Sequence, residues 1–312
     1  MSTEAQDRNN KIVGMLKSED TGLFKKAANL ISDYTRIQIR ESSIFEKVIP
    51  SVKIGDDELT PQLATDKPVK LVYREPDSPG AVTIPLGSQP LQYYIHGSMY
   101  PVFFDRIVTT KFQKDVDELR PYGIDIRQII SDNAILDMDF EFDRKMLAAV
   151  QSIIGAEGST VPETGIIQNK VIVDSAGITR QSLAELKKIL PSTFAKLQTA
   201  TIVVNQITIE DIAAFDRTEA GGDMSQDMFV EGFQKTRLLN TNWIVTNKIE
   251  LIANNEFYLF ASPEFMGKSF VLQDTTMYVD KKAYNIEFWA YCLRGATIVN
   301  IASVAKGRIS TT

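Results

Sequence analysis

The chain has 312 residues, of which 44% are hydrophobic and 24% charged, a balance typical of globular proteins that argues against disordered, collagen-like and coiled-coil classes. A single cysteine, Cys292, and a single histidine, His96, exclude a disulfide within the chain and a zinc site built from several such ligands. No apolar run reaches the length of a membrane span, and the N-terminal residues have no apolar signal-peptide core. We therefore expect about two folded domains in a reducing cytoplasm, without contact to a membrane.

The net charge of −6 is concentrated between residues 210 and 231, which hold seven acidic side chains and one basic side chain. Outside this segment the numbers of basic and acidic side chains are equal. A protein that grips DNA tightly needs a basic surface along the phosphate backbone, so we expect no tight DNA binding. Within the acidic segment we predict a mobile loop that includes Asp216, Glu219, Asp223 and Asp227.

Two segments in the first third of the chain are not expected to bury a core by themselves. Residues 21–39 place apolar side chains at steps of three and four, which predicts an amphipathic helix without a partner nearby in the sequence. Residues 44–110 consist of short β-type runs between Pro and Gly. The hairpins predicted there pair residues 69–74 with 81–86 and residues 91–95 with 99–104. Both segments are expected to pack on other parts of the fold or on a neighbouring molecule.

A short helix is predicted near residues 113–120, followed by a long helix over residues 124–154. The long helix carries an apolar side chain at every fourth position: Ile126, Ile130, Ala134, Met138, Phe142, Met146, Val150 and Ile154. On a helix of 3.6 residues per turn such a row advances by about 40° per step, so it meets different neighbours along its length. We interpret this helix as a spine whose core positions include Ile130, Met138, Phe142 and Met146.

After a loop that begins near residue 155, helical and strand-like patterns alternate, which predicts an α/β core. Its expected elements are a strand over 170–174, a helix over 179–190 capped by Thr179 and followed by Pro191, a strand over 199–204 and a helix over 207–215. Beyond the acidic segment we predict a short helix over 229–235, strands over 243–246 and 256–261, and a long β-type run over 284–304.

Two local patterns resemble ligand sites but lack an essential residue. Gly267-Lys268-Ser269 would need a glycine five positions before Gly267 to cradle a phosphate, and that position is Ser262, so we predict a plain turn between strands. The run Asp137, Asp139, Glu141 and Asp143 resembles the start of a calcium loop, but its sixth position is Phe142 where that loop needs glycine. We place these carboxylates on solvated faces of the long helix, with Glu141 paired to Lys145.

Other catalytic candidates have simpler structural interpretations. His96 beside a glycine turn and Cys292 within IEFWAYCL are a base and a nucleophile in principle, but a cysteine in a strand is usually a small buried hydrophobe. Asp56, Asp57 and Glu58 lie in a loop bounded by Gly and Pro, where carboxylates are more often solvated than catalytic. We therefore expect no catalytic, cofactor or metal site.

The order of these elements resembles the major capsid proteins of tailed phages of the Hong Kong 97 type. The segment from FDRIVTTKF to AAVQSIIG, residues 104–155, resembles the run from the extended loop into the spine helix of that family. TRQSLAELKKIL, TATIVVN and ITIEDIAAF resemble the start of its axial domain, and AYNIEFWAYCLRGATIVNIASVAKGRI is similar to its long terminal strands. The family has no short diagnostic motif, so the order of elements over about residues 20–309 carries the resemblance.

The resemblance implies an α+β fold of the Hong Kong 97 type with four parts. These are an N-terminal arm (1–49), an extended β-hairpin loop (50–110), a peripheral domain with the spine helix (111–175 and 271–299) and an α/β axial domain (176–270 and 300–312). The loop is expected to reach a neighbouring subunit. Its expected contact residues are Val69, Leu71, Pro76, Gly80, Val82 and Ile84.

The implied function is that of a major capsid protein without enzymatic activity or cofactor. It would assemble itself into pentamers and hexamers of an icosahedral shell around packaged double-stranded DNA, held only by weak, non-specific contact, in a virion assembled in the host cytoplasm. No scaffolding domain precedes the arm, so a separate scaffolding protein or none is expected, besides a decoration protein and a portal. We find no Lys and Asn pair to which a covalent crosslink of the family can be carried over.

Three alternatives remain open at the level of sequence. The first is an encapsulin-like compartment of the same fold, and the second is an α/β enzyme with an unrecognised carboxylate site. The third is another virion part, such as a tail or portal-associated ring protein. The size of the assembly separates a shell from an enzyme, because an enzyme would form a small oligomer.

Overall fold

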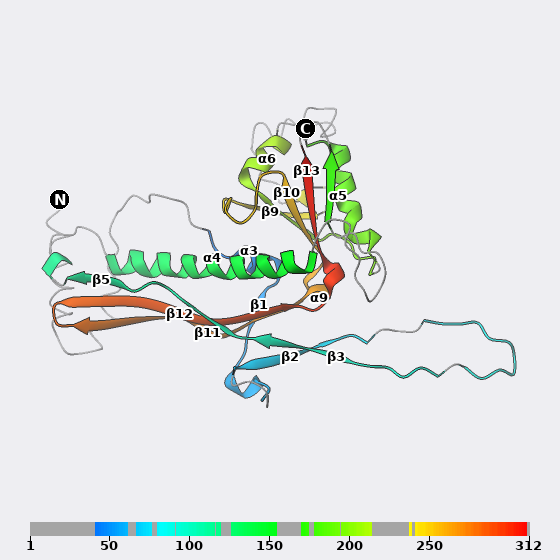
Figure 1. Cartoon of the computed structure of the whole chain (residues 1–312), viewed down its shortest axis with the longest axis horizontal. Helices are drawn as coiled ribbons and strands as arrows, with labels where there is room; N and C mark the ends of the chain where they lie inside the picture. Colours follow the sequence, from blue (N-terminus) through cyan, green and yellow to red (C-terminus); the bar gives the residue numbers. More distant parts are fainter. Residues whose placement is uncertain are drawn as a thin grey trace.

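The computed structural model describes residues 41–61, 67–76, 80–90, 92–115, 117–119, 126–154, 170–174, 178–193, 195–213, 237–238 and 241–310. A long helix lies along a long sheet, a lobe of helices and strands stands on one side, and a hairpin projects from the other (Figure 1). No helix within the described ranges is long and apolar enough to cross a membrane. The helices expected over 21–39 and 229–235 and the predicted acidic loop lie outside the described residues.

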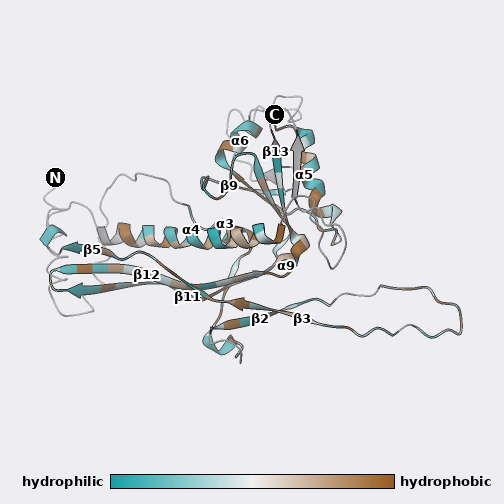
Figure 2. Cartoon of the chain, viewed as in Figure 1, coloured by the Kyte–Doolittle hydropathy of each residue, from teal (hydrophilic) through white to brown (hydrophobic). Residues whose placement is uncertain are grey.

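The spine is helix α4 (Ile126–Ile154), which confirms the long helix predicted from the fourfold apolar spacing. Hydrophobic and hydrophilic residues alternate along it (Figure 2). The apolar row is buried from Ala134 to Ile154 and packs into the main hydrophobic core. Packing of this apolar row against the core therefore holds the helix in place.

A five-stranded sheet lies beside the spine in the order β1–β11–β12–β4, with β5 also paired to β12. The strands are β1 (Ser51–Lys53), β4 (Asp105–Val108), β5 (Phe112–Asp115), β11 (Gly267–Lys282) and β12 (Asn285–Ile298). Along β12, Ile286, Phe288, Ala290 and Cys292 are buried at alternate positions. Alternate side chains of a strand point to opposite faces, so one face of the sheet packs against α4 and the other faces away from it.

The lobe is built on a six-stranded sheet in the order β6–β13–β10–β7–β9–β8. Its strands are β6 (Lys170–Asp174), β7 (Thr201–Asn205), β8 (Arg237–Leu238), β9 (Thr241–Thr246), β10 (Glu256–Phe260) and β13 (Val304–Ser310). Helices α5 (Arg180–Ser192) and α6 (Gln206–Ala213) belong to the same lobe. All five residues of β7 are buried, as in a strand covered on both faces. The predicted α/β core is therefore confirmed.

The projecting hairpin consists of β2 (Val69–Arg74) and β3 (Ser98–Phe103), paired antiparallel from Val69 opposite Phe103 to Arg74 opposite Ser98. Short helical turns connect the larger elements. They are α3 (Ile44–Val48), η2 (Asp56–Glu58), η3 (Asp117–Leu119), α9 (Pro263–Met266) and η4 (Ile301–Ser303). The first of these turns, α3, and the residues 41–43 before it are called the arm root. The apolar side chains of α3 pack against the spine.

The hairpins predicted over residues 69–104 are wrong, because β2 pairs with β3 and not with residues 81–86. The residues described between these strands have no strand partner. Pro85 and Pro90 cannot donate a ladder hydrogen bond, and Gly80 and Gly87 have φ values of 80° and 89°. The backbone therefore continues outward as a long loop instead of turning back early.

Three further expectations are corrected by strand pairing. In the helix expected near residues 113–120, residues 117–119 are helical, as the 3-10 turn η3, but residues 113–115 belong to strand β5, because pairing with β12 outweighs local helix propensity. Strand β6, assigned to the peripheral domain, pairs in parallel with β13 and so belongs to the lobe. Strands β1 and β4, assigned to the extended loop, belong to the five-stranded sheet. The predicted end of α5 is also wrong, since Pro191 lies in its last turn.

Candidate subunit interface

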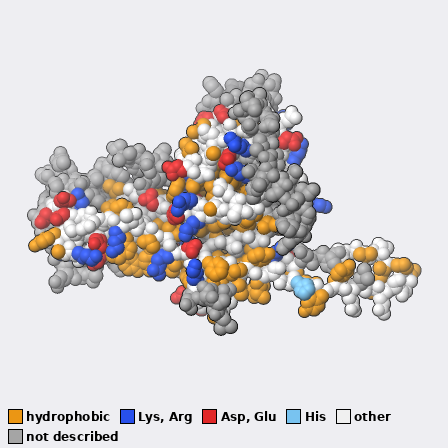
Figure 3. Space-filling model, viewed as in Figure 1, with side chains coloured by type: hydrophobic (Ala, Val, Ile, Leu, Met, Phe, Trp, Pro, Cys, Tyr) orange, Lys and Arg blue, Asp and Glu red, His pale blue; other side chains and the backbone are white. Residues whose placement is uncertain are grey.

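The most conspicuous surface is the loop between β2 and β3, which projects away from the rest of the molecule (Figure 1). Residues 78–104 contain no Asp, Glu, Lys or Arg. Hydrophobic side chains and uncharged polar groups cover its described part, with the single histidine among them (Figure 3). Val82, Leu86, Tyr93, Tyr94 and Ile95 are all more than half exposed. An exposed apolar projection of this kind indicates a surface that is covered in an assembly.

The residues expected to contact a neighbour divide into two groups. Pro76, Gly80, Val82 and Ile84 are exposed on the loop, and Leu71 is half-buried on β2. Val69 is fully buried by its own chain, so the expectation that a neighbour must cover it is wrong. It lies at the root of the hairpin, where residue 60 donates a backbone hydrogen bond to its carbonyl oxygen over 2.8 Å.

The root of the hairpin is fixed to the face of the five-stranded sheet that points away from α4. Val102 and Phe104 form a buried cluster with Ile54 and Phe270, and Phe270 lies directly opposite Gly295 in the sheet. A Cβ atom added at Gly295 would lie 2.6 Å from the carbonyl oxygen of Phe103. Glycine at this position lets the hairpin cross the sheet in close contact. The root of the hairpin is therefore held firmly, whereas the described residues of the loop are exposed.

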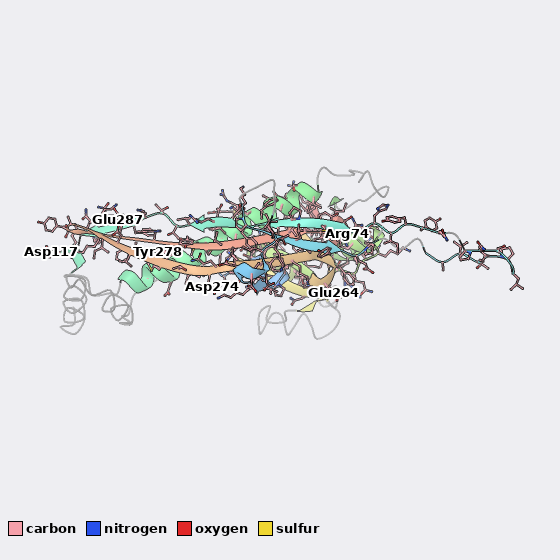
Figure 4. All side chains as sticks on the ribbon, turned by 90° about the horizontal axis from the view of Figure 1, so that it is seen from below. Arg74, Asp117, Glu264, Asp274, Tyr278 and Glu287 are labelled. Atoms are coloured by element: carbon pink, nitrogen blue, oxygen red, sulfur yellow. The ribbon has the colours of Figure 1, made fainter. Side chains whose placement is uncertain are left out.

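Farther along the same face, three aromatic rings of strands β11 and β12 are stacked. Tyr278, which contacts both other rings, lies towards the end of the sheet opposite to Arg74 (Figure 4). The ring of Tyr278 lies 5.7 Å from that of Trp289 and 5.4 Å from that of Tyr291, nearly parallel to both. The Lys111 ammonium lies 4.4 Å from the Trp289 ring and the Arg106 guanidinium 5.3 Å from the Tyr291 ring. Cross-strand aromatic pairs and cation–π contacts stabilise this end of the paired strands β11 and β12.

The predicted spine positions Met138, Phe142 and Met146 are buried, and Ile130 is half-buried. The carboxylates beside them are not all solvated, as the sequence suggested, because Asp139 and Asp143 are also buried. Glu141 pairs with Arg144 instead of Lys145. Asp137 and Glu141 do lie nearer the surface, so only half of the run faces water.

Asp143 joins three parts of the chain. Its carboxylate accepts hydrogen bonds from the Ser43 hydroxyl at 2.7 Å and from the backbone N–H groups of Ile44 and Phe45 at 2.9 and 3.1 Å. Lys248 of the lobe donates to the same carboxylate at 2.6 Å and to the Ser42 carbonyl oxygen at 3.0 Å. The N–H groups at the start of α3 thus find a carboxylate acceptor on the spine.

A second charged cluster connects the spine to β12. Arg294 donates to Glu46 at 3.0 Å and to Asp139 at 2.9 Å, and its guanidinium lies 5.7 Å from the ring centre of Phe142. Burial raises the pKa of the Glu46 carboxyl, and Arg294 partly offsets this effect. Among the described residues, the buried Arg294 Nε has no hydrogen-bond partner. This geometry holds the sheet, the spine and the residues at the start of α3 together.

One pattern in the sequence, beside the fourfold apolar row, predicts that two of these carboxylates are buried. Asp139, Asp143 and Leu147 form a second row at the same spacing, next to the first, and Leu147 is buried. A carboxylate four residues before a core leucine lies on the same helix face as that leucine. It therefore points towards the interior and needs a partner there.

The catalytic candidates do not come together. His96 is exposed on the projecting loop, where its ring centre lies 4.8 Å from that of Tyr94. Cys292 is fully buried on the face of β12 towards α4, and burial raises the pKa of its thiol. Gly267, Lys268 and Ser269 begin strand β11, and Asp56–Glu58 form the exposed turn η2. In the described part of the chain, no three His, Cys, Asp or Glu residues lie close enough together to hold a metal ion.

Comparison with solved structures identifies the fold. No protein-family model and no curated protein matches the sequence. The capsid of cyanophage P-SCSP1u is similar over 96% of this chain and 98% of that chain, with a TM-score of 0.62 and 12% identity. The mature capsid of bacteriophage PhiM1 (91% and 92%, TM-score 0.58, 7% identity) and the capsid of a native GTA particle (94% and 100%, TM-score 0.54, 12% identity) are also similar. The chain therefore has the fold of phage capsid proteins, as its order of elements predicted.

Proposed function

We propose that this protein is the major capsid protein of a tailed phage, which assembles into an icosahedral shell around packaged double-stranded DNA. One observation carries this proposal: the chain combines the capsid fold with a projecting loop whose residues 78–97 are uncharged and largely apolar and whose root is fixed to the sheet. A free subunit would expose this loop to water, whereas neighbouring subunits can cover it. Closed symmetric assemblies arise when each subunit covers its neighbour in this way.

The remaining parts of the proposal follow from the same arrangement. The five-stranded sheet with α4 forms the peripheral domain, and the lobe with the six-stranded sheet forms the axial domain near the centre of pentamers and hexamers. Equal numbers of basic and acidic side chains outside residues 210–231 favour weak, non-specific contact with DNA. The protein is assembled in the host cytoplasm and is then part of the virion. Its further partners are a scaffolding or decoration protein and a portal.

Particle formation is the direct test of this function. Purified protein, alone and with a candidate scaffold, is examined by light scattering and negative-stain electron microscopy. We expect closed particles of megadalton mass. A stable monomer or small oligomer at high concentration under both conditions would instead favour the alternative of an α/β enzyme.

A loop deletion tests the observation that carries the proposal. Residues 75–97 are replaced by Asn-Gly, which makes a two-residue turn between Arg74 and Ser98, the last pair of the hairpin. The body is unchanged, so near-native circular dichroism and thermal unfolding are expected together with loss of shells. Normal particles from this variant would contradict the proposed role of the loop. Unfolding of the variant would do the same, because it would mean that the loop supports its own chain.

A further inference from the structure

The single histidine of the chain, His96, lies on the projecting loop, two residues before β3 begins. Its side chain is exposed, and its ring centre lies 4.8 Å from that of Tyr94. Figure 3 shows this histidine in pale blue beside hydrophobic side chains of the loop. Because Cys292 is buried on β12, His96 belongs to no catalytic pair with it, and its titration can act only on what the loop itself does.

The part of the loop around His96 is uncharged and apolar. Residues 78–104 contain no Asp, Glu, Lys or Arg. Tyr94, Ile95 and Met99 are 85%, 61% and 57% exposed. Covering such a surface in an assembly removes apolar area from water, which is favourable. A protonated imidazole on the same surface would lose its hydration when it is covered, which is unfavourable.

The charged side chains nearest to His96 in the hairpin pairing are at the end of β2. Arg74 lies opposite Ser98, and Glu75 and Asp77 come next in the sequence, with Asp77 outside the described residues. Arginine and carboxylate side chains ordinarily keep their charges between about pH 5.5 and about pH 7.5, and tyrosine ordinarily stays neutral. Histidine ordinarily gains a proton near about pH 6.5, within this interval. A change of charge on this part of the hairpin near neutral pH therefore has to come from His96.

Resting on the proposed capsid function, in which neighbouring subunits cover the loop, we propose that His96 makes assembly sensitive to pH. The neutral imidazole is covered together with the apolar side chains around it, whereas the protonated imidazole weakens the contact. The free subunit binds this proton more readily than the covered subunit, so assembly becomes less favourable as pH falls. The fold of the subunit is unaffected, because His96 is already exposed in the isolated chain.

Proton linkage sets the size of the effect. When the covered state excludes the protonated form, the equilibrium constant changes by up to tenfold for each pH unit below the ordinary titration range of histidine. Each subunit has one such loop and one such histidine. The protein concentration needed for particles should therefore rise about tenfold between about pH 7.5 and about pH 5.5.

Substitutions of the full chain test the proposal, with particles followed by light scattering and negative-stain electron microscopy, alone and with a candidate scaffold. His96→Gln stays neutral at both pH values, so the difference between them should fall below about twofold. His96→Lys stays positively charged, so particles should already need about tenfold more protein at about pH 7.5. Gln181→Lys is the matched control, since it adds the same charge at an exposed position of α5 and should behave as the unmodified protein.

Other titrating groups are the same in the proteins that are compared. Glu46, whose pKa is raised by burial, is present in the unmodified protein and in His96→Gln alike. The difference between these two proteins therefore reports on His96. Circular dichroism and thermal unfolding at both pH values check that the subunits remain folded.

A chemical probe tests whether His96 is covered in the particle. Diethylpyrocarbonate transfers an ethoxycarbonyl group to a neutral imidazole nitrogen, with release of ethanol and carbon dioxide, and mass spectrometry assigns the product to the only histidine of the chain. We expect fast modification in dissociated subunits and much slower modification in intact particles at the same pH. Equal rates in the two states would overturn the proposal.

The outcomes separate this inference from the proposed function. If the unmodified protein and His96→Gln form particles with the same dependence on pH, the histidine proposal fails and the capsid function stands. If the unmodified protein assembles better at about pH 5.5 than at about pH 7.5 and His96→Gln does not, an acidic group of the neighbour holds the protonated imidazole, and the proposed direction is overturned. If neither protein forms particles at either pH, both proposals fail.

Discussion

Asp143 of the spine and Lys248 of the lobe form an ion pair of 2.6 Å in which both side chains are almost completely buried. The same carboxylate receives the hydroxyl of Ser43 and the backbone N–H groups at the start of α3. A buried charge is tolerated only when it is paired and fully hydrogen-bonded, and here the partners of Asp143 come from two other segments, the residues at the start of α3 and Lys248 of the lobe. The carboxylate of Asp143 therefore holds the spine, the lobe and the arm root in fixed positions relative to one another.

Asp143→Ala is expected to lower the free energy of unfolding by about 3–5 kcal/mol, because Lys248 would remain buried without its counter-charge. Glu141→Ala is the control on the same helix, where an exposed pair with Arg144 contributes less than about 1 kcal/mol. Urea denaturation of the two variants measures the difference. Combining Asp143→Leu with Lys248→Met should recover much of the loss. Equal effects of Asp143→Ala and Glu141→Ala would contradict the structural role of the pair.

Phe142→Ala is expected to destabilise the fold by about 3–5 kcal/mol, since the ring is buried in the core and its removal leaves a cavity. The change also removes the ring near the Arg294 guanidinium. Ile135→Ala on the exposed face of the same helix should cost less than about 1 kcal/mol. Thermal melts distinguish the two, and a loss below about 0.5 kcal/mol for Phe142→Ala would mean that this face of the helix is not in the core.

Gly295→Ala is expected to displace the hairpin root without unfolding the body. The added methyl group would lie 2.6 Å from the Phe103 carbonyl oxygen and 3.1 Å from Val102 Cγ1, so β3 must move away from the sheet. Limited proteolysis should then cut the loop faster than in the unmodified protein, and particle yield should fall. Gly97→Ala is the control, because a Cβ atom there meets nothing within 4 Å. Identical behaviour of the two variants would contradict the close crossing.

The partly buried carboxyl group of Glu46 is expected to make the free energy of unfolding depend on pH. Burial raises its pKa in the folded state, so the folded protein binds this proton more readily than the unfolded chain does. Stability contributed by Glu46 is therefore highest below its unfolded pKa and is lost as pH rises through the folded pKa. Glu46→Gln removes this titration and keeps an oxygen acceptor for Arg294.

The test of this effect compares the unmodified protein with the variant, because other groups also titrate. Hydrogen bonds from Lys111 and Lys282 lower the pKa of Glu287, which therefore acts in the opposite direction. Free energies of unfolding are compared at about pH 4, near the usual pKa of a glutamate, and at about pH 7, well above it. The Glu46→Gln variant should gain on the unmodified protein as pH rises. A constant difference, or a gain in the opposite direction, would show that burial does not control this carboxyl.

Local periodicity was enough to predict the elements whose own residues form the core. The fourfold apolar row gave α4, and the alternation of apolar helices and strands gave β6, α5, β7 and α6 in the correct order. These patterns are local consequences of the periods of 3.6 and 2 residues. The order of elements then indicated the capsid fold, which the solved structures confirm.

Pairing between distant segments was not predictable from the same patterns. Residues 112–115 became a strand because the edge of β12 was available, and residues 69–74 paired across a long loop with residues 98–103. The partners of Asp139 and Asp143 also come from distant positions, such as Arg294 and Lys248. The spacing of residues within one helix does not show which distant charged side chain will pair with a buried carboxylate.

The sequence alone thus determined the spine helix, the α/β core, the lack of charged residues over 78–97 and the family of folds, because each depends on the spacing or order of residues along the chain. Only the tertiary structure decided which face of the sheet carries the hairpin, and that Val69 is buried while Val82 is exposed. These features depend on side chains from remote segments competing for the same apolar surface, and that competition is resolved only when the chain is packed in three dimensions.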